Sequence, residues 1–155
     1  MAWLKAKDTI SGQEGRAYAT IDGDVEEMFY IKSLEATVEK EKTDVKTLGK
    51  RGTQHKANGW SGSGSMTVYY TTTRFRQLML KYIKEGVDTY FDIMVVNDDP
   101  SSSIGQQTVI LKGVNLDSVI MAKVDTDSEV LDEDIDFTFD DVDIQDSFTA
   151  PTLGA

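Results

Sequence analysis

The sequence predicts a mainly β (β+α) protein, an antiparallel β-sandwich or barrel with one flanking α-helix at residues 74–85 and a long projecting loop at residues 39–59. Apolar and polar residues alternate over several separate segments, which is the period of half-buried strands. Only one segment has the apolar spacing of an amphipathic helix. Several strands, one helix and then more strands are typical of a sheet-based fold with the helix packed at one end.

The length of 155 residues favours a single domain, 1–155, with a flexible N-terminal arm (1–15) and a C-terminal tail (148–155). The sequence has no cysteine, which excludes disulfides and thiolate zinc sites and fits a reducing cytosol. No run approaches the roughly 20 apolar residues that a membrane helix needs. The first residues also lack the apolar segment of a signal peptide.

The first half of the chain predicts two strands and a turn. Residues 16–21 form the first strand, and Asp22-Gly23-Asp24 form a tight turn in which glycine supplies the positive φ. Residues 26–42 form a long strand with one apolar face, and Phe29 and Ile31 are apolar exceptions on the other face.

The rest of the chain predicts further strands at residues 60–71, 90–96, 108–112 and 114–124. Glycines stand at the start of the first of these, and a kink is expected at Gly113 between the last two.

The helix is predicted by one apolar stripe that we expect to pack against the sheet. Thr73 is expected to cap the helix and Gly86 to end it. The stripe consists of Phe75, Leu78, Met79, Tyr82 and Ile83.

The last strand, residues 132–146, has one apolar face and one acidic face. Its apolar positions change parity after Asp140-Asp141, which predicts a β-bulge in one long, bent strand. Residues 125–146 contain eleven acidic residues and no Lys or Arg, so the net charge of −11 belongs to this segment and the remaining 16 acidic residues balance the 16 basic ones. Like charges repel on a strand, which suggests either a basic surface opposite this face or a purpose for the negative field.

The projecting loop carries six of the sixteen basic residues and few large apolar ones. A loop this long is either functional or disordered. A basic surface and an acidic surface on one chain can pair head-to-tail between copies, giving rings or filaments. Surface ion pairs contribute only about 0–1 kcal/mol each, so sheet pairing and apolar burial would supply most of the association energy.

Motifs of catalysis and cofactor binding are missing from the sequence. His55 is the only histidine, Gly62-Ser63-Gly64 lacks the lysine of a phosphate-binding loop, and the acidic run lacks calcium-loop spacing. We therefore predict no enzymatic activity and no cofactor, although a glycosidase-type carboxylate pair cannot be recognised from spacing alone. A pI near 4.4 argues against affinity for nucleic acid, but not against a duct through which nucleic acid slides.

An ordered set of short runs resembles a known family over residues 8–148. The runs are Ser11-Gly12-Gln13-Glu14-Gly15-Arg16-Ala17-Tyr18, Ile21-Asp22-Gly23, Phe29-Tyr30-Ile31-Lys32-Ser33-Leu34-Glu35-Ala36, Thr47-Leu48-Gly49-Lys50-Arg51-Gly52, Gly62-Ser63-Gly64, Arg74-Phe75 and the alternating acidic end. Together they resemble the tail tube proteins of contractile phage tails, in particular those of PBSX-type defective prophages. That family is similar in fold to the tube protein of the type VI secretion system.

The resemblance implies a structural virion protein. Six copies would form a ring whose sheets join into an inner barrel, and stacked rings would form a tube inside a contractile sheath. The tube would be a conduit for DNA or ions, with DNA as non-adhering cargo. Partners would be other copies of the chain and the sheath, baseplate and tail-terminator proteins, without a membrane, in a phage-tail-like particle assembled in the bacterial host cytoplasm.

The resemblance and the charge pattern together give two sets of candidate interface residues. The loop would reach neighbouring subunits and rings, and the acidic residues would either receive that loop or line the lumen; the residues leave both uses open. The alternative is a monomeric acidic module that binds a basic partner or a divalent cation. The loop set is Lys40, Lys42, Lys46, Lys50, Arg51 and Lys56, and the acidic set is Asp132, Asp134, Asp136, Asp140, Asp141 and Asp143.

Overall fold

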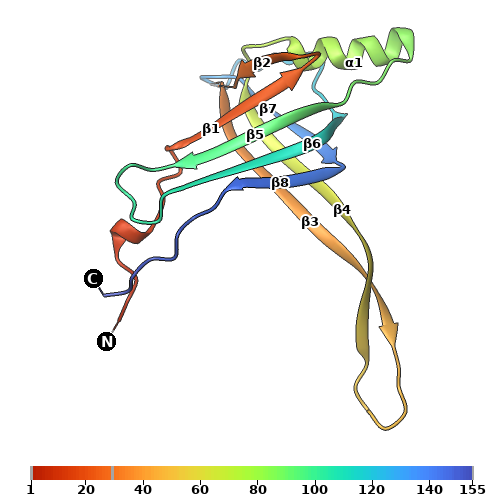
Figure 1. Ribbon diagram of the computed structural model, residues 1–155. Coiled ribbons are helices and arrows are strands. Elements are labelled where there is room, and N and C mark those ends of the chain that lie inside the picture. Colours follow the sequence, from red (N-terminus) through yellow and green to blue (C-terminus); the bar gives the residue numbers. More distant parts are fainter. Residues whose placement is uncertain (1, 29, 155) are drawn as a thin grey trace.

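The computed structural model describes residues 2–28 and 30–154; Phe29, one of the apolar exceptions noted above, lies outside them. It confirms a mainly β fold with antiparallel strands and one α-helix (Figure 1). The sheet does not close into a barrel, because β2 and β3 lie at its two ends. The elements are a short 3-10 helix η1 (Ala6–Asp8), β1 (Gly15–Ile21), β2 (Asp24–Glu27), β3 (Ile31–Val45), β4 (Gln54–Tyr69), α1 (Arg74–Glu85), β5 (Phe91–Asp98), β6 (Gln106–Ser118), β7 (Asp132–Phe139) and β8 (Asp141–Asp146).

The strands run in the order β2-β1-β5-β6-β7-β4-β3, and β8 pairs with β6. β6 belongs to both layers: its first part pairs with β5 and β8, and its last part pairs with β7. The core lies between the layers and is built by the alternate residues that face inward. Its largest fully buried apolar side chains are Ile21, Met28, Met66, Val68, Phe75, Ile93, Val114, Ile135 and Phe137.

The parity change near Asp140 marks a change of layer, so the prediction of one bent strand is wrong. β7 ends at Phe139 after pairing with β4, and β8 starts at Asp141 and pairs with β6. β6 changes layer beside it, at Gly113, whose φ of +67° is the left-handed region that glycine favours. A Cβ on Gly113 would lie 2.7 Å from the Asp140 carboxylate, and the Asp140 N–H donates to the Lys112 carbonyl. The predicted kink at Gly113 is therefore confirmed, and it forms one corner with Asp140.

Residues 39–59 project from the domain as predicted, but the prediction that they form a loop is wrong, because most of them form a β-hairpin. β3 and β4 stay paired out to Val45 and Gln54, which leaves only residues 46–53 as an irregular tip. Figure 1 shows the hairpin extending far beyond the body of the domain. The two strands of the hairpin form backbone hydrogen bonds with each other, so the hairpin can form although its polar side chains bury no hydrophobic face. We call residues 39–59 the projecting hairpin.

Two other strand boundaries differ from prediction. The long strand predicted at residues 26–42 is interrupted, since β2 ends at Glu27 and β3 starts at Ile31, with Met28 and Tyr30 buried between them. The strand predicted at residues 114–124 is the end of β6, which stops at Ser118. Residues 119–131 then run to β7 without a regular element.

Helix α1 packs on the core through its first two turns, where Phe75 is buried and the half-buried Leu78 packs against the core. Phe75 is 1% exposed, whereas Tyr82 is 52% and Ile83 59% exposed, so the expected burial of the whole stripe is wrong. The end of the helix extends beyond the edge of the sheet (Figure 1), and Tyr82 there lines an open pocket with Asn115 and Leu116 of β6 instead of packing in the core. Gly86 ends the helix with a left-handed φ of +70°, as predicted, but the Thr73 side chain makes no capping hydrogen bond.

The N-terminal and C-terminal segments lie side by side against the loop between β5 and β6 (Figure 1). The Ser103 hydroxyl donates to Asp8 over 2.5 Å, and the Ser11 N–H donates to Asp99 over 2.9 Å. Thr149 donates to the carbonyl of Ile104. Flexibility of the arm in solution stays a prediction, and these contacts are what would have to open.

Candidate assembly surfaces

The projecting hairpin holds all six candidate basic residues in exposed positions. Lys46, Lys50 and Arg51 lie at the tip, and Lys40, Lys42 and Lys56 lie on the paired strands. Within the described part of the chain, none of the six has a carboxylate within ion-pair distance. The hairpin is thus not folded back on the acidic residues of its own domain.

The two faces of β3 in the hairpin carry opposite charge. Successive side chains of a strand point to opposite faces, so Lys40 and Lys42 lie on one face, and Glu39 and Glu41 lie on the other. The basic face continues the core side of β3, because Lys40 shares its parity with Leu34, which packs on the core. The acidic face continues the outer side of the sheet.

The outer side of β3, β4 and β7 is a surface of hydroxyl and carboxylate groups, which we call the polar face. Its cross-strand rows follow from the register, in which Glu35 pairs with Ser65, and Ser65 with Asp136. The Thr67 hydroxyl donates to Asp134 over 2.6 Å. An open groove on this face brings Glu35, Asp136 and Asp117 together. The members of the polar face are Ser33, Glu35, Thr37, Ser63, Ser65, Thr67, Asp117, Asp134, Asp136 and Thr138.

The six candidate acidic residues do not form one patch. Asp132, Asp134 and Asp136 point to the outer side of β7, Asp140 lies at the corner, and Asp141 and Asp143 lie on β8 in the other layer. Two of the six have basic partners in the same chain. Asp132 lies 3.2 Å from Lys32 and 3.9 Å from Lys123, and Asp143 lies 2.5 Å from the Lys112 ammonium and raises the pKa of Lys112. Asp134, Asp136, Asp140 and Asp141 have no ion pair among the described residues.

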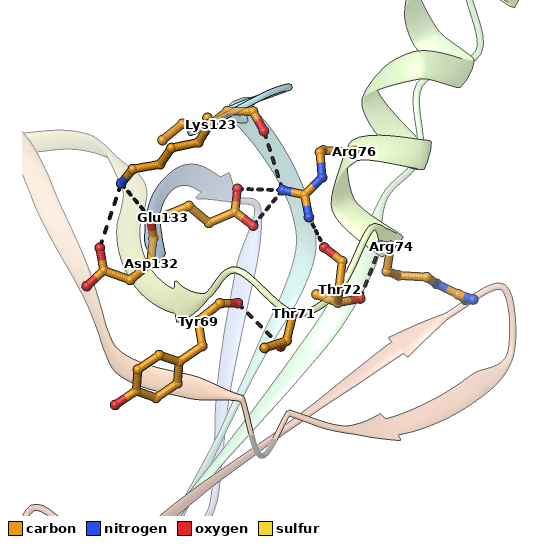
Figure 2. Close-up of polar contacts among 9 residues, drawn as sticks. Tyr69, Thr71, Thr72, Arg74, Arg76, Lys123, Asp132 and Glu133 are labelled. Atoms are coloured by element: carbon orange, nitrogen blue, oxygen red, sulfur yellow. Dashed lines mark hydrogen bonds and ion pairs between the residues drawn. The ribbon is translucent and has the colours of Figure 1, made fainter. Parts of the chain in front are cut away.

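A buried ion pair joins α1 to β7, and the sequence analysis did not identify it (Figure 2). The Arg76 guanidinium donates to both oxygens of Glu133 over 2.9 Å, and it also donates to the carbonyls of Thr72 and Ile120. Its other contact is with the Tyr70 ring, whose centroid lies 4.3 Å away. One signal in the sequence was available: Glu133 has the same parity as Ile135 and Phe137, which places a carboxylate on the core face.

The described residues contain no other arrangement with evident chemistry. Between residues 2 and 154, Phe29 excepted, no three His, Asp or Glu side chains are placed to hold a metal ion. In the same part of the chain, no helix has the length and apolar character needed to cross a membrane.

Comparisons with known proteins agree with the resemblance noted in the sequence. Residues 2–146 match the family described as phage tail tube protein. The chain is 48% identical over 141 residues to the phage-like element PBSX protein XkdM of Bacillus subtilis (strain 168), covering 91% of this chain and 93% of that protein.

Two solved structures share the fold at low sequence identity. One is a chain of the sheath–tube complex of an extracellular contractile injection system in the extended state, with a TM-score of 0.68, 12% identity and coverage of 90% and 93% of the two chains. The other is a chain of the 6-fold symmetrised baseplate of the anti-feeding prophage, with a TM-score of 0.65, 11% identity and coverage of 93% and 97%. The fold, and above all the match along nearly the whole sequence, lead to one conclusion: this chain belongs to the phage tail tube protein family.

Proposed function

We propose that the protein assembles into hexameric rings that stack into the inner tube of a contractile tail. The observation that carries this proposal is the projecting hairpin, whose six basic residues have no acidic partner among the described residues of their own chain. A hairpin of this length buries nothing by itself, and a second copy gives it a surface to bind. Six-fold symmetry is supported by the 6-fold symmetrised baseplate, one chain of which shares this fold.

The polar face is proposed to line the lumen. It faces away from the core and consists of carboxylates and small hydroxyl side chains. The cations next to it, Lys32 and Lys123, both lie within 4.0 Å of Asp132, which offsets their charge toward a passing polyanion. DNA binds proteins mainly through phosphate contacts with Lys and Arg. A lumen of this kind repels the phosphates and lets DNA or ions pass without adhering.

The role proposed is structural, without enzymatic activity. The tube would contact the sheath on its outside and the baseplate and tail-terminator proteins at its ends. The site of action would be a phage tail or phage-tail-like particle, assembled in the cytoplasm of the bacterial host.

Microscopy of concentrated protein tests the assembly directly. We expect negative-stain images to show rings of six and hollow tubes, with association favoured at low salt because the hairpin charges are then less screened. Absence of rings and tubes across protein concentration and salt would contradict the proposal.

Cysteine labelling tests the lumen assignment, since the natural chain has no cysteine. Ser63→Cys on the polar face should react with a large polymer-linked maleimide in the monomer and be protected from it in tubes. A small maleimide should react in both states. Lys81→Cys on α1 is the matched control, and equal reactivity of both cysteines with the large reagent in tubes would place the polar face outside.

A further inference from the structure

An apolar groove lies at the base of the projecting hairpin, just beyond the end of the core. It is open, has a volume of about 430 Å³ and is lined by Val38, Lys40, Ala57, Gly59, Trp60 and Val142. Trp60 packs on Phe139 at the edge of the core, with ring centroids 6.3 Å apart, yet it is 43% exposed, and Val38 is 47% exposed. The side chains that form the core side of the sheet thus continue past the end of the core, where their own chain leaves them uncovered.

Residues 119–131 form a second exposed surface with the complementary character. Met121, Val124 and Val130 are 44%, 91% and 63% exposed. Between them lie Asp125, Asp127 and Glu129, none of which makes an ion pair with a described residue. The segment therefore presents apolar side chains together with carboxylates that make no ion pair with a described residue.

Hydrogen bonds hold residues 119–131 to the rest of the domain near both ends of this segment. The Arg76 guanidinium donates to the carbonyl of Ile120, and the Lys123 ammonium donates to the carbonyl of Asp132 over 2.7 Å (Figure 2). A local turn holds its centre, where the Asp127 N–H donates to the Asp125 carboxylate. These contacts present residues 124–130 in a defined place, although the segment has no regular secondary structure.

We propose that the groove at the hairpin base binds residues 119–131 of a second copy, so that this contact joins successive rings; the proposal rests on the stacked tube proposed above. The groove supplies apolar surface flanked by Lys40 and Lys42, which share its side of β3. The bound segment supplies the exposed valines and the three carboxylates. Apolar burial gives the contact its affinity, and the charges fix its orientation.

The two surfaces lie at opposite ends of the domain, so one chain cannot join them. Asp132, which anchors the segment, pairs with Lys32 at the start of β3. The groove lies eight residues further along the same strand, at Lys40, which is about 26 Å at about 3.3 Å per residue. Complementary surfaces at opposite ends of one molecule associate head-to-tail and repeat without limit along the strand direction, as successive rings of a tube do.

Crosslinking between introduced cysteines tests the contact. A chain with Lys40→Cys and Asp127→Cys, treated with a short bis-maleimide under assembly conditions, should give a ladder of covalent oligomers. The control chain has Lys40→Cys and Lys81→Cys, which places the second cysteine on α1, and should give no ladder. Tubes in the microscope without a ladder from the first chain would overturn this contact and leave the tube intact, whereas absence of tubes from the unmodified protein would refute the proposed function itself.

A charge exchange tests the same contact without crosslinking. Lys40→Glu with Lys42→Glu should abolish sedimentable tubes while the monomer keeps its melting temperature, because both side chains are exposed. Adding Asp125→Lys and Asp127→Lys to that chain should restore tubes. Tubes that form normally from the Lys40→Glu, Lys42→Glu chain, or a failure of the second pair to restore them, would contradict the proposal.

Discussion

Replacing Glu133 by glutamine should be among the most destabilising single changes in this protein. Glu133 is 1% exposed and accepts two hydrogen bonds from the Arg76 guanidinium, each 2.9 Å long. Glutamine has nearly the same shape but no charge, so the change leaves the buried guanidinium, 10% exposed, without a counter-ion.

The expected cost follows from the burial of both groups. Removing one partner of a buried ion pair costs about 3–5 kcal/mol, because the remaining charge stays desolvated. For a domain of this size that loss corresponds to a fall in melting temperature of roughly 10 °C. The Arg76→Met, Glu133→Leu double variant removes both charges and should be close to wild type in stability.

The assay is urea unfolding of the monomer followed by circular dichroism. Lys32→Met is the matched control, because the Lys32–Asp132 pair has similar atoms 3.2 Å apart but is substantially exposed, and it should cost at most about 1 kcal/mol. A loss below about 1 kcal/mol for Glu133→Gln would refute the reasoning, since it would mean that water reaches the guanidinium. A double variant less stable than either single variant would also refute it.

Three further predictions concern packing, assembly and pH. Gly64→Ala should lower the free energy of unfolding by about 1–3 kcal/mol through overpacking, because the new Cβ would lie 2.5 Å from the Phe137 ring and 2.7 Å from the Glu35 carbonyl. In thermal melts, adding Phe137→Leu should restore part of the lost stability. Gly12→Ala, where nothing lies within 4 Å of the new Cβ, should leave the stability unchanged. Lys50→Glu with Arg51→Glu should impair ring stacking in sedimentation and micrographs with little change in monomer melting, and an equal loss of monomer stability would instead place the tip in the packing of its own domain. Hydrogen bonds from Ser103 to Asp8 and from Ser101 to Asp99 lower the pKa of both carboxyls from 3.8, so their stabilisation of the arm is complete above about pH 4 and is lost as pH falls through the lower folded pKa values. Amide protection of Ser11, which donates to Asp99, should then fall, and protection that persists in Asp99→Ala at pH 7 would show that this side chain does not hold the arm.

The sequence predicts the fold class and the elements that depend on local signals. The helix at residues 74–85 is found to the residue, because its apolar spacing and Gly86 are contained in one short window. The strand at residues 16–21 differs from β1 by one residue for the same reason. The position of the kink at Gly113 is also local, since it depends on one residue with a left-handed φ.

Features that depend on distant partners were not predicted correctly. The sequence pattern of the hairpin indicates a loop, because neither strand has a buried apolar face. The strands are recognised only from their pairing in the structure, for example Lys42 with Ala57 and Asp44 with His55. The change of layer at Asp140 reads as a bulge, because parity shows that the faces exchange but not which strand is the new neighbour. The Arg76–Glu133 pair joins residues 57 positions apart, and no local pattern connects them.

The length of the pairing between β3 and β4 decides how the hairpin carries force. The two strands are paired from Ile31 with Val68 to Val45 with Gln54, with register shifts between Ile31 and Ser33 and between Glu41 and Lys42, so their hydrogen bonds cross the hairpin axis along most of the strand. A pull on one strand along that axis, against a body that holds the other, loads these bonds in shear and all at once. If the strands were instead pulled apart from one end, the same hydrogen bonds would break one after another. The backbone pairing of the hairpin therefore resists axial load, whereas its exposed side chains determine which neighbouring subunit it binds.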